Sequence, residues 1–180
     1  MKPKNRKNTR GGRKIGYVVV ICAGYMVCCR RVDELKAHSP DSKFDGHAYA
    51  YFVEHLLAPA VREHLDIGPD IEIHGIEDNV RLHKSPPVVA AKARANVRIL
   101  EGYPCYSPDL NPIENFFANL VKFIDMRYRL VQPVSLHEFD LEILTAMQEL
   151  EASGLCERLY GSMPERLHDV VHAGGGATRW

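Results

Sequence analysis

Short segments of strand character alternate with segments of helical periodicity along most of the chain, and this order limits the fold more than any other feature. The strand-like segments are Ile15–Val32, Ile71–Ile76 and Val97–Leu100. The helical segments are Gly46–His64, Ser85–Ala95 and a long stretch that begins at Pro112. This alternation is typical of an α/β domain, in which helices cover the faces of a sheet.

Local signals set the boundaries of these segments. Ile15–Val32 is dense in Val, Ile, Tyr and Cys, and its interruption at Ala23-Gly24 predicts two strands joined by a tight turn. Ser85 is placed to cap the helix predicted to end near Ala95, and Pro86 occupies the first position of that helix. The apolar stripe of the long helix consists of Ile113, Phe116, Phe117, Leu120, Val121 and Ile124. Two or three further helices and a run of three glycines, Gly174–Gly176, complete the chain.

Basic residues are concentrated at the start of the chain. The 180 residues include 23 basic and 23 acidic ones, yet the first fourteen residues hold seven of the bases and none of the acids. Residues 15–180 therefore carry a net charge of −7, which gives them little sequence-independent affinity for DNA phosphates. Residues 1–14 are predicted to form a basic disordered tail, which is either a nuclear address or a solvated segment.

The five cysteines form no CxxC pair and show no zinc-type spacing. Cys22, Cys28 and Cys29 fall in an apolar run and are predicted to be buried free thiols, which indicates a reducing, intracellular setting. No stretch reaches 18 uninterrupted apolar residues, so no membrane partner is expected.

Two acidic residues occupy positions that suit metal chemistry. Asp78 follows a predicted strand, and Glu114 lies in the first turn of a predicted helix 36 positions later. Strand ends and helix starts at one sheet edge are where α/β proteins place their sites. Two carboxylates brought together in this way could hold Mg²⁺ for phosphoryl transfer.

From the pattern alone, a structural explanation of both residues is favoured over a catalytic one. Asn111 as N-cap, Pro112 at the first position and Glu114 at the third resemble a capping box. Asp78 begins an Asp-Asn pair, a common turn former.

A longer motif changes this balance. Residues 106–115, Tyr-Ser-Pro-Asp-Leu-Asn-Pro-Ile-Glu-Asn, resemble the signature around the third catalytic acid of Tc/mariner-type DDE transposases, with that acid at Glu114. Upstream, Asp78-Asn79 with His83 resembles the element around the second catalytic acid. Ser162–Leu167 and Gly174–Thr178 are similar to the end of the family's chains.

The resemblance implies a ribonuclease H-like fold, a mixed five-stranded sheet flanked by helices, with residues 15–180 as part of a DDE catalytic domain. It implies Mg²⁺- or Mn²⁺-dependent cleavage of DNA at transposon ends, followed by strand transfer, with Asp78 and Glu114 as catalytic metal ligands. Asn79, His83, Asp109 and Asn111 would support the site.

The family's first catalytic aspartate lies on a central strand before the hairpin, and residues 1–14 contain neither an acid nor a strand-like pattern. The first central strand and its carboxylate are therefore expected to be missing from these 180 residues. Asp33, Asp41 and Asp45 follow the hairpin, so none of them fits the family's order. The expected consequences are impaired activity and an exposed sheet edge prone to association.

Two other functions remain open. One is a non-catalytic remnant, either a decaying gene product or a truncated subunit that joins a full-length transposase. The other is a module that binds nucleic acid through its basic tail. The expected protein partner is a full-length transposase or a second copy in a homo-oligomer. A DNA substrate implies an intracellular location, the nucleus in a eukaryote.

Overall fold

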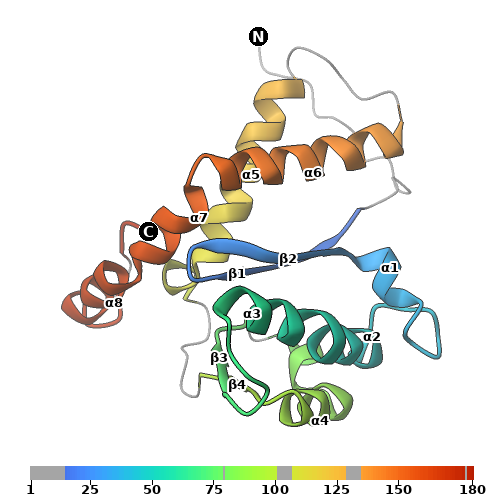
Figure 1. Cartoon of the computed structure of the whole chain (residues 1–180). Helices are drawn as coiled ribbons and strands as arrows, with labels where there is room; N and C mark the ends of the chain where they lie inside the picture. Colours follow the sequence, from blue (N-terminus) through green and yellow to red (C-terminus); the bar gives the residue numbers. More distant parts are fainter. Residues whose placement is uncertain (1–14, 79, 101–106, 129–134, 177) are drawn as a thin grey trace.

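The computed structural model describes residues 15–78, 80–100, 107–128, 135–176 and 178–180. A β-hairpin crosses the middle of the molecule between two groups of helices (Figure 1). Its strands are β1 (Tyr17–Cys22) and β2 (Tyr25–Arg31). On one side lie α2 (Gly46–Phe52), α3 (Ala58–Leu65) and α4 (Pro86–Arg94). On the other side lie α5 (Pro112–Tyr128), α6 (Leu136–Ala152) and α7 (Leu155–Gly161).

Both faces of the hairpin are covered, because its side chains alternate between two hydrophobic clusters. Val18, Val20 and Cys22 pack with the cluster that contains Phe52 and Val88. Tyr17, Val19 and Ile21, which alternate with them, pack with the cluster that contains Phe116 and Met147. Such two-sided burial explains why the sequence of this segment is an apolar run instead of a polar–apolar alternation.

The hairpin follows the sequence prediction closely. The strands are antiparallel, and a bulge at Val27 shifts the register between the Val20–Cys28 and Ile21–Met26 pairs. Ala23 and Gly24 both take positive φ angles, 48° and 90°, as a two-residue hairpin turn requires. Asp140 of α6 anchors the hairpin: its carboxylate accepts a short hydrogen bond from the Tyr17 hydroxyl and lies 2.9 Å from Arg31 Nη1.

The helix predicted over 46–64 is present but is not uniformly α-helical. α2 continues into a π-helical turn, η1 (Val53–Leu57), and then into α3. Pro59 explains the change, because it has no N–H to donate to residue 55 and its ring crowds that carbonyl. Asp45 caps the run by accepting from the amides of His47 and Ala48.

A strand–helix–strand unit follows this long helix. β3 (Ile73–Gly75) and β4 (Val97–Ile99) pair in parallel, with α4 between them in the chain. Ser85 is the N-cap of α4, as predicted, but its hydroxyl donates to the Leu82 carbonyl at 2.8 Å and makes no capping bond. A short 3₁₀ turn, η2 (Arg81–Lys84), leads into α4, and α1 (Val32–Lys36) follows the hairpin; neither was predicted.

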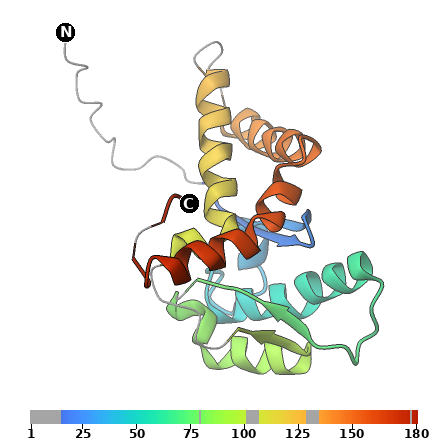
Figure 2. The same ribbon diagram turned by 90° about the vertical axis from the view of Figure 1, so that its left-hand side faces the viewer.

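The helices after residue 107 form the second half of the molecule. A 3₁₀ turn, η3 (Pro108–Leu110), precedes α5, and α8 (Met163–His172) follows α7. Figure 2 shows α8 lying across the N-terminal end of α5, with the C-terminus close by. Phe116 and Leu120 of the predicted apolar stripe are buried, whereas Val121 is 59% exposed.

The sheet differs from a single five-stranded one. β1 pairs only with β2, and β3 pairs only with β4, so the described residues form two separate two-stranded sheets. No strand among the described residues bridges the two pairs. Among the described residues, no helix combines the length and apolar character that a membrane span requires.

Candidate active site

Asp78 lies just after β3, where the parallel pair ends. Its side chain is 51% exposed, and Oδ1 lies 3.0 Å from His83 Nδ1. The Val80 amide donates to the same oxygen at 3.4 Å, and His83 Nδ1 lies 3.3 Å from the Asp78 carbonyl oxygen. The Asp78 carboxylate and the His83 imidazole are therefore in direct contact.

A buried polar cluster lies directly behind Asp78. The Glu77 carboxylate is 13% exposed; it accepts from the Tyr49 hydroxyl at 3.0 Å and forms a short ion pair with Lys92. Lys92 Nζ also donates to the His83 carbonyl at 3.1 Å, and the Tyr49 ring stacks on His83 at 4.4 Å. Burial, reinforced by the Glu77 charge, raises the pKa of the Tyr49 hydroxyl, so Tyr49 stays a hydrogen-bond donor.

Glu114 is an exposed residue in the first turn of α5. Asn111 begins that turn: its Oδ1 accepts from the Ile113 amide at 3.4 Å, and its carbonyl accepts from the Glu114 amide at 3.1 Å. Between described residues, the Glu114 carboxylate makes no return bond to the Asn111 amide. The capping-box explanation is thus half right, because Asn111 caps the helix and the Glu114 carboxylate is left for other partners.

Asp109 does not present its carboxylate in the same way. Its Oδ2 accepts from the Thr178 hydroxyl at 3.0 Å, and its carbonyl accepts from Arg166 Nη1 at 2.8 Å. The structure therefore places this predicted supporting residue in contact with the C-terminal segment. Asn79, the remaining supporting residue, lies outside the described residues.

The donor chemistry fits a hard divalent cation. Asp78 and Glu114 are exposed oxygen donors, and Mg²⁺ binds proteins through one or two carboxylates while keeping several waters. No three His, Cys, Asp or Glu side chains gather as a metal-binding group within the described ranges. The described residues thus offer individual carboxylates and not a complete protein cage.

Comparison with known proteins gives this site a context. The family model described as DDE superfamily endonuclease matches residues 22–131, more than half of the chain, and the match includes Asp78 and Glu114. The chain belongs to this family of DDE superfamily endonucleases. No curated protein sequence is significantly similar to it.

Solved structures extend the likeness of this DDE family member to the fold. The chain is similar to the Mos1 mariner paired end complex with Mn at 18% identity, with a TM-score of 0.70, over 97% of this chain and 48% of that one. It also resembles the catalytic domain of Mos1 mariner transposase at 16% identity, with a TM-score of 0.65, over 92% of this chain and 82% of that one. The chain thus spans about half the length of the chain in the complex and has the fold of the catalytic domain.

Sequence reasoning missed the residues that support the two carboxylates. Tyr49 and Lys92 are an ordinary helical tyrosine and lysine in the sequence, and they lie 28 and 15 positions from Glu77. Arg166 falls in the motif that resembles the family's C-terminal ending, but nothing in that motif indicates a contact with Asp109. The sequence held one sign of this buried cluster: Glu77 is a second acid beside Asp78 at the end of a predicted strand.

Proposed function

We propose that the chain is the catalytic-domain portion of a DDE transposase that acts on DNA at transposon ends, with Asp78 and Glu114 as metal ligands. One observation carries the proposal. Within the segment that matches the family, the two acids predicted to be catalytic are exposed, while the neighbouring acids Glu77 and Asp109 are engaged in hydrogen bonds. Exposure leaves both carboxylates accessible to a cation, and their positions within the family-matched segment favour a catalytic role.

The residues around the site have distinct parts in this function. Asp78 and Glu114 would hold Mg²⁺ or Mn²⁺, which supplies Lewis-acid activation of the attacking oxygen and stabilisation of the leaving oxygen in phosphoryl transfer. His83 holds Asp78 Oδ1 through Nδ1, which leaves Oδ2 for the cation. Glu77, Tyr49 and Lys92 fix the backbone on either side of Asp78 without competing for the cation.

Catalysis by these 180 residues alone is proposed to be weak. A two-metal site needs a carboxylate between both ions, and the described residues gather no third acid with Asp78 or Glu114. Asp33 pairs with Lys36, and Asp45 caps α2, so both are engaged elsewhere. A full-length transposase is the proposed source of the missing carboxylate, and the nucleus is the proposed location in a eukaryote.

The test measures nicking of a DNA duplex by the purified chain with Mg²⁺ or Mn²⁺, alongside Mn²⁺ binding measured by electron paramagnetic resonance. We expect slow nicking and measurable Mn²⁺ binding, and we expect Asp78→Asn and Glu114→Gln each to abolish nicking and weaken binding. Asp41→Asn is the matched control, because Asp41 is an exposed acid whose carboxylate is 72% exposed beside Lys43.

The outcomes separate the competing functions. Mn²⁺ binding that depends on both acids, without nicking, would support a non-catalytic subunit that retains the metal site. Binding that ignores both substitutions would reject the proposal. DNA binding that requires only residues 1–14, with a steep salt dependence, would indicate a nucleic-acid-binding module instead.

A further inference from the structure

Arg166 of α8 is a buried arginine, with 1% of its surface exposed. Its Nη1 donates to the Asp109 carbonyl at 2.8 Å and to Asn115 Oδ1 at 2.9 Å. Its Nε donates to the Oγ of Ser162, the N-cap residue of α8, at 2.8 Å. One guanidinium therefore joins α8 to both sides of the turn where α5 begins.

The last residues of the chain make a second connection to the same turn. Residues 178–180, here called the C-terminal strap, fold back so that Thr178 Oγ1 donates to Asp109 Oδ2 at 3.0 Å. The Trp180 ring lies 4.6 Å from the Arg166 guanidinium, and its Nε1 donates to Asp169 Oδ2 at 3.0 Å. The strap therefore contacts both Asp109 and Arg166.

The glycine run makes this return possible. α8 ends at His172, and Gly174 and Gly175 take φ angles of 58° and 81°, in the left-handed region that favours glycine. The Gly175 amide donates to the Val170 carbonyl at 3.0 Å, which closes the helix end as the chain reverses. The glycines thus have a defined conformational role, where the sequence alone called for no more than flexibility.

We propose that Arg166 and the C-terminal strap position Glu114, so that the end of the chain is a working part of the active site. The inference rests on the proposed function of Glu114. Asp109 and Asn115 lie five residues before and one residue after Glu114, so their bonds to α8 fix the segment that carries its carboxylate. Residues that orient metal ligands through hydrogen bonds commonly change metal affinity when they are replaced.

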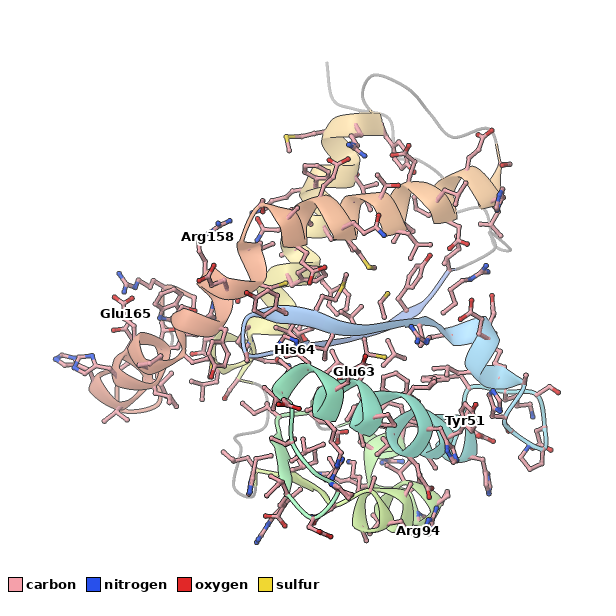
Figure 3. All side chains as sticks on the ribbon, viewed as in Figure 1. Tyr51, Glu63, His64, Arg94, Arg158 and Glu165 are labelled. Atoms are coloured by element: carbon pink, nitrogen blue, oxygen red, sulfur yellow. The ribbon has the colours of Figure 1, made fainter. Side chains whose placement is uncertain are left out.

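The first measurement is amide hydrogen exchange of the metal-free chain at Ile113 and Glu114, whose amides bond to Asn111. Thr178→Val removes the hydroxyl that bonds to Asp109 at nearly constant side-chain shape. Arg166→Lys keeps the positive charge but cannot bond to both Asp109 and Asn115 as the guanidinium does. We expect both to accelerate exchange at these amides by about tenfold or more, with α6 amides unchanged. Arg158→Met is the control, because Arg158 is exposed on α7 and donates to Ser153 (Figure 3).

The second measurement is the Mn²⁺ affinity of the same variants, under conditions in which circular dichroism shows each to be folded. We expect Thr178→Val and Arg166→Lys to weaken Mn²⁺ binding by about tenfold, and Arg158→Met to leave it unchanged. A purely structural contact would lower thermal stability without moving the affinity of the folded protein.

The two measurements distinguish the possible failures. Folded variants with wild-type exchange and wild-type affinity would overturn the inference. Faster exchange with unchanged Mn²⁺ affinity would also overturn it, because the contact would then be structural only. If the wild-type chain binds no Mn²⁺ through Asp78 and Glu114, the proposed function fails, and exchange alone decides whether the strap holds the turn.

Discussion

Glu77 and Asp78 are neighbours in the chain with opposite environments, since their side chains are 13% and 51% exposed. Lys92, the ion-pair partner of Glu77, is also largely buried, at 12%. Breaking a buried pair leaves a charge without compensation, which costs more than the pair itself contributes. Removing either partner of this ion pair is therefore expected to destabilise the segment that contains Asp78.

We predict that Glu77→Ala lowers the free energy of unfolding by about 2–4 kcal/mol, because Lys92 then remains buried without its carboxylate. Urea denaturation measures the change. Glu54→Ala is the control, since it breaks a similar ion pair with Arg94, whose side chain is 58% exposed, and should have a much smaller effect. Equal losses of unfolding free energy in the two variants would contradict the prediction that burial makes the Glu77–Lys92 pair the more costly one to break.

The thiols of Cys29, which is half-buried, and Cys156, which is buried, give a prediction about reactivity. Burial raises the pKa of Cys29 and of Cys156 to about 11, so both remain protonated at neutral pH. Alkylation by iodoacetamide at pH 7.5 should be about 100-fold slower than for an ordinary cysteine, and the rate should rise with pH up to that pKa. Mass spectrometry of each site measures the rate, and similar labelling in native and urea-unfolded chain would refute the prediction.

At this scale, site candidates could be chosen from the sequence where short motifs contain them, but their buried neighbours could not. Asp78, Glu114 and His83 could be chosen because short motifs carry them. The cluster around Glu77 could not be foreseen, because Tyr49 and Lys92 reach it from separate helices through tertiary packing.

At the scale of elements, the hairpin turn depends on glycine for two reasons. Gly24 has a φ of 90°, and a Cβ at this position would lie 3.0 Å from the Glu157 Cα of α7. The turn therefore combines a left-handed backbone with a close approach to a helix.

We predict that Gly24→Ala destabilises the chain by about 1–3 kcal/mol, because strain and steric overlap add. Gly161→Ala is the control: Gly161 ends α7, a Cβ there meets nothing within 4 Å, and alanine should be neutral or stabilising. Thermal denaturation compares the two variants, and a Gly24→Ala variant as stable as the wild type would show that the loop adjusts freely.

Most elements could be predicted because their patterns are local. The hairpin, the long helix after Asp45 and the β3–α4–β4 unit all lie where periodicity and breakers placed them. The π-helical turn at Val53–Leu57 was missed, although Pro59 was visible as its cause. The Ser85 hydroxyl was misassigned because η2 offers it the nearby Leu82 carbonyl, which competes with the helix amides.

At the scale of the whole molecule, the two hydrophobic clusters share one hairpin. The cluster around Phe52 and Val88 and the cluster around Phe116 and Met147 both include side chains of β1. Loss of either cluster would expose one face of that strand. The two halves are therefore expected to unfold together.

We predict that Phe52→Ala and Phe116→Ala, which both truncate fully buried rings, each lower stability by about 3–5 kcal/mol within one cooperative transition. Hydrogen exchange should show that each substitution reduces protection in both clusters by a similar amount. Two transitions, each moved by only one substitution, would show that the halves fold independently.

The α/β class was predictable from the order of segments, whereas the division into two clusters was not. Alternation along β1 is invisible in an apolar run, because Val, Ile, Tyr and Cys suit either face. The split into two separate sheets was not predicted either, since the sequence indicated one mixed sheet with an exposed edge.

The two-sided hairpin also bears on recombination between relatives. Helices α5, α6 and α7 meet β1 through Tyr17, Val19 and Ile21, and α6 also meets β2 through the link from Asp140 to Arg31. The helices of the other half meet β1 through Val18, Val20 and Cys22. In a chimera that takes α5, α6 and α7 from another family member, the new helices would therefore need to fit Tyr17, Val19 and Ile21. The alternate side chains, Val18, Val20 and Cys22, would keep their original partners.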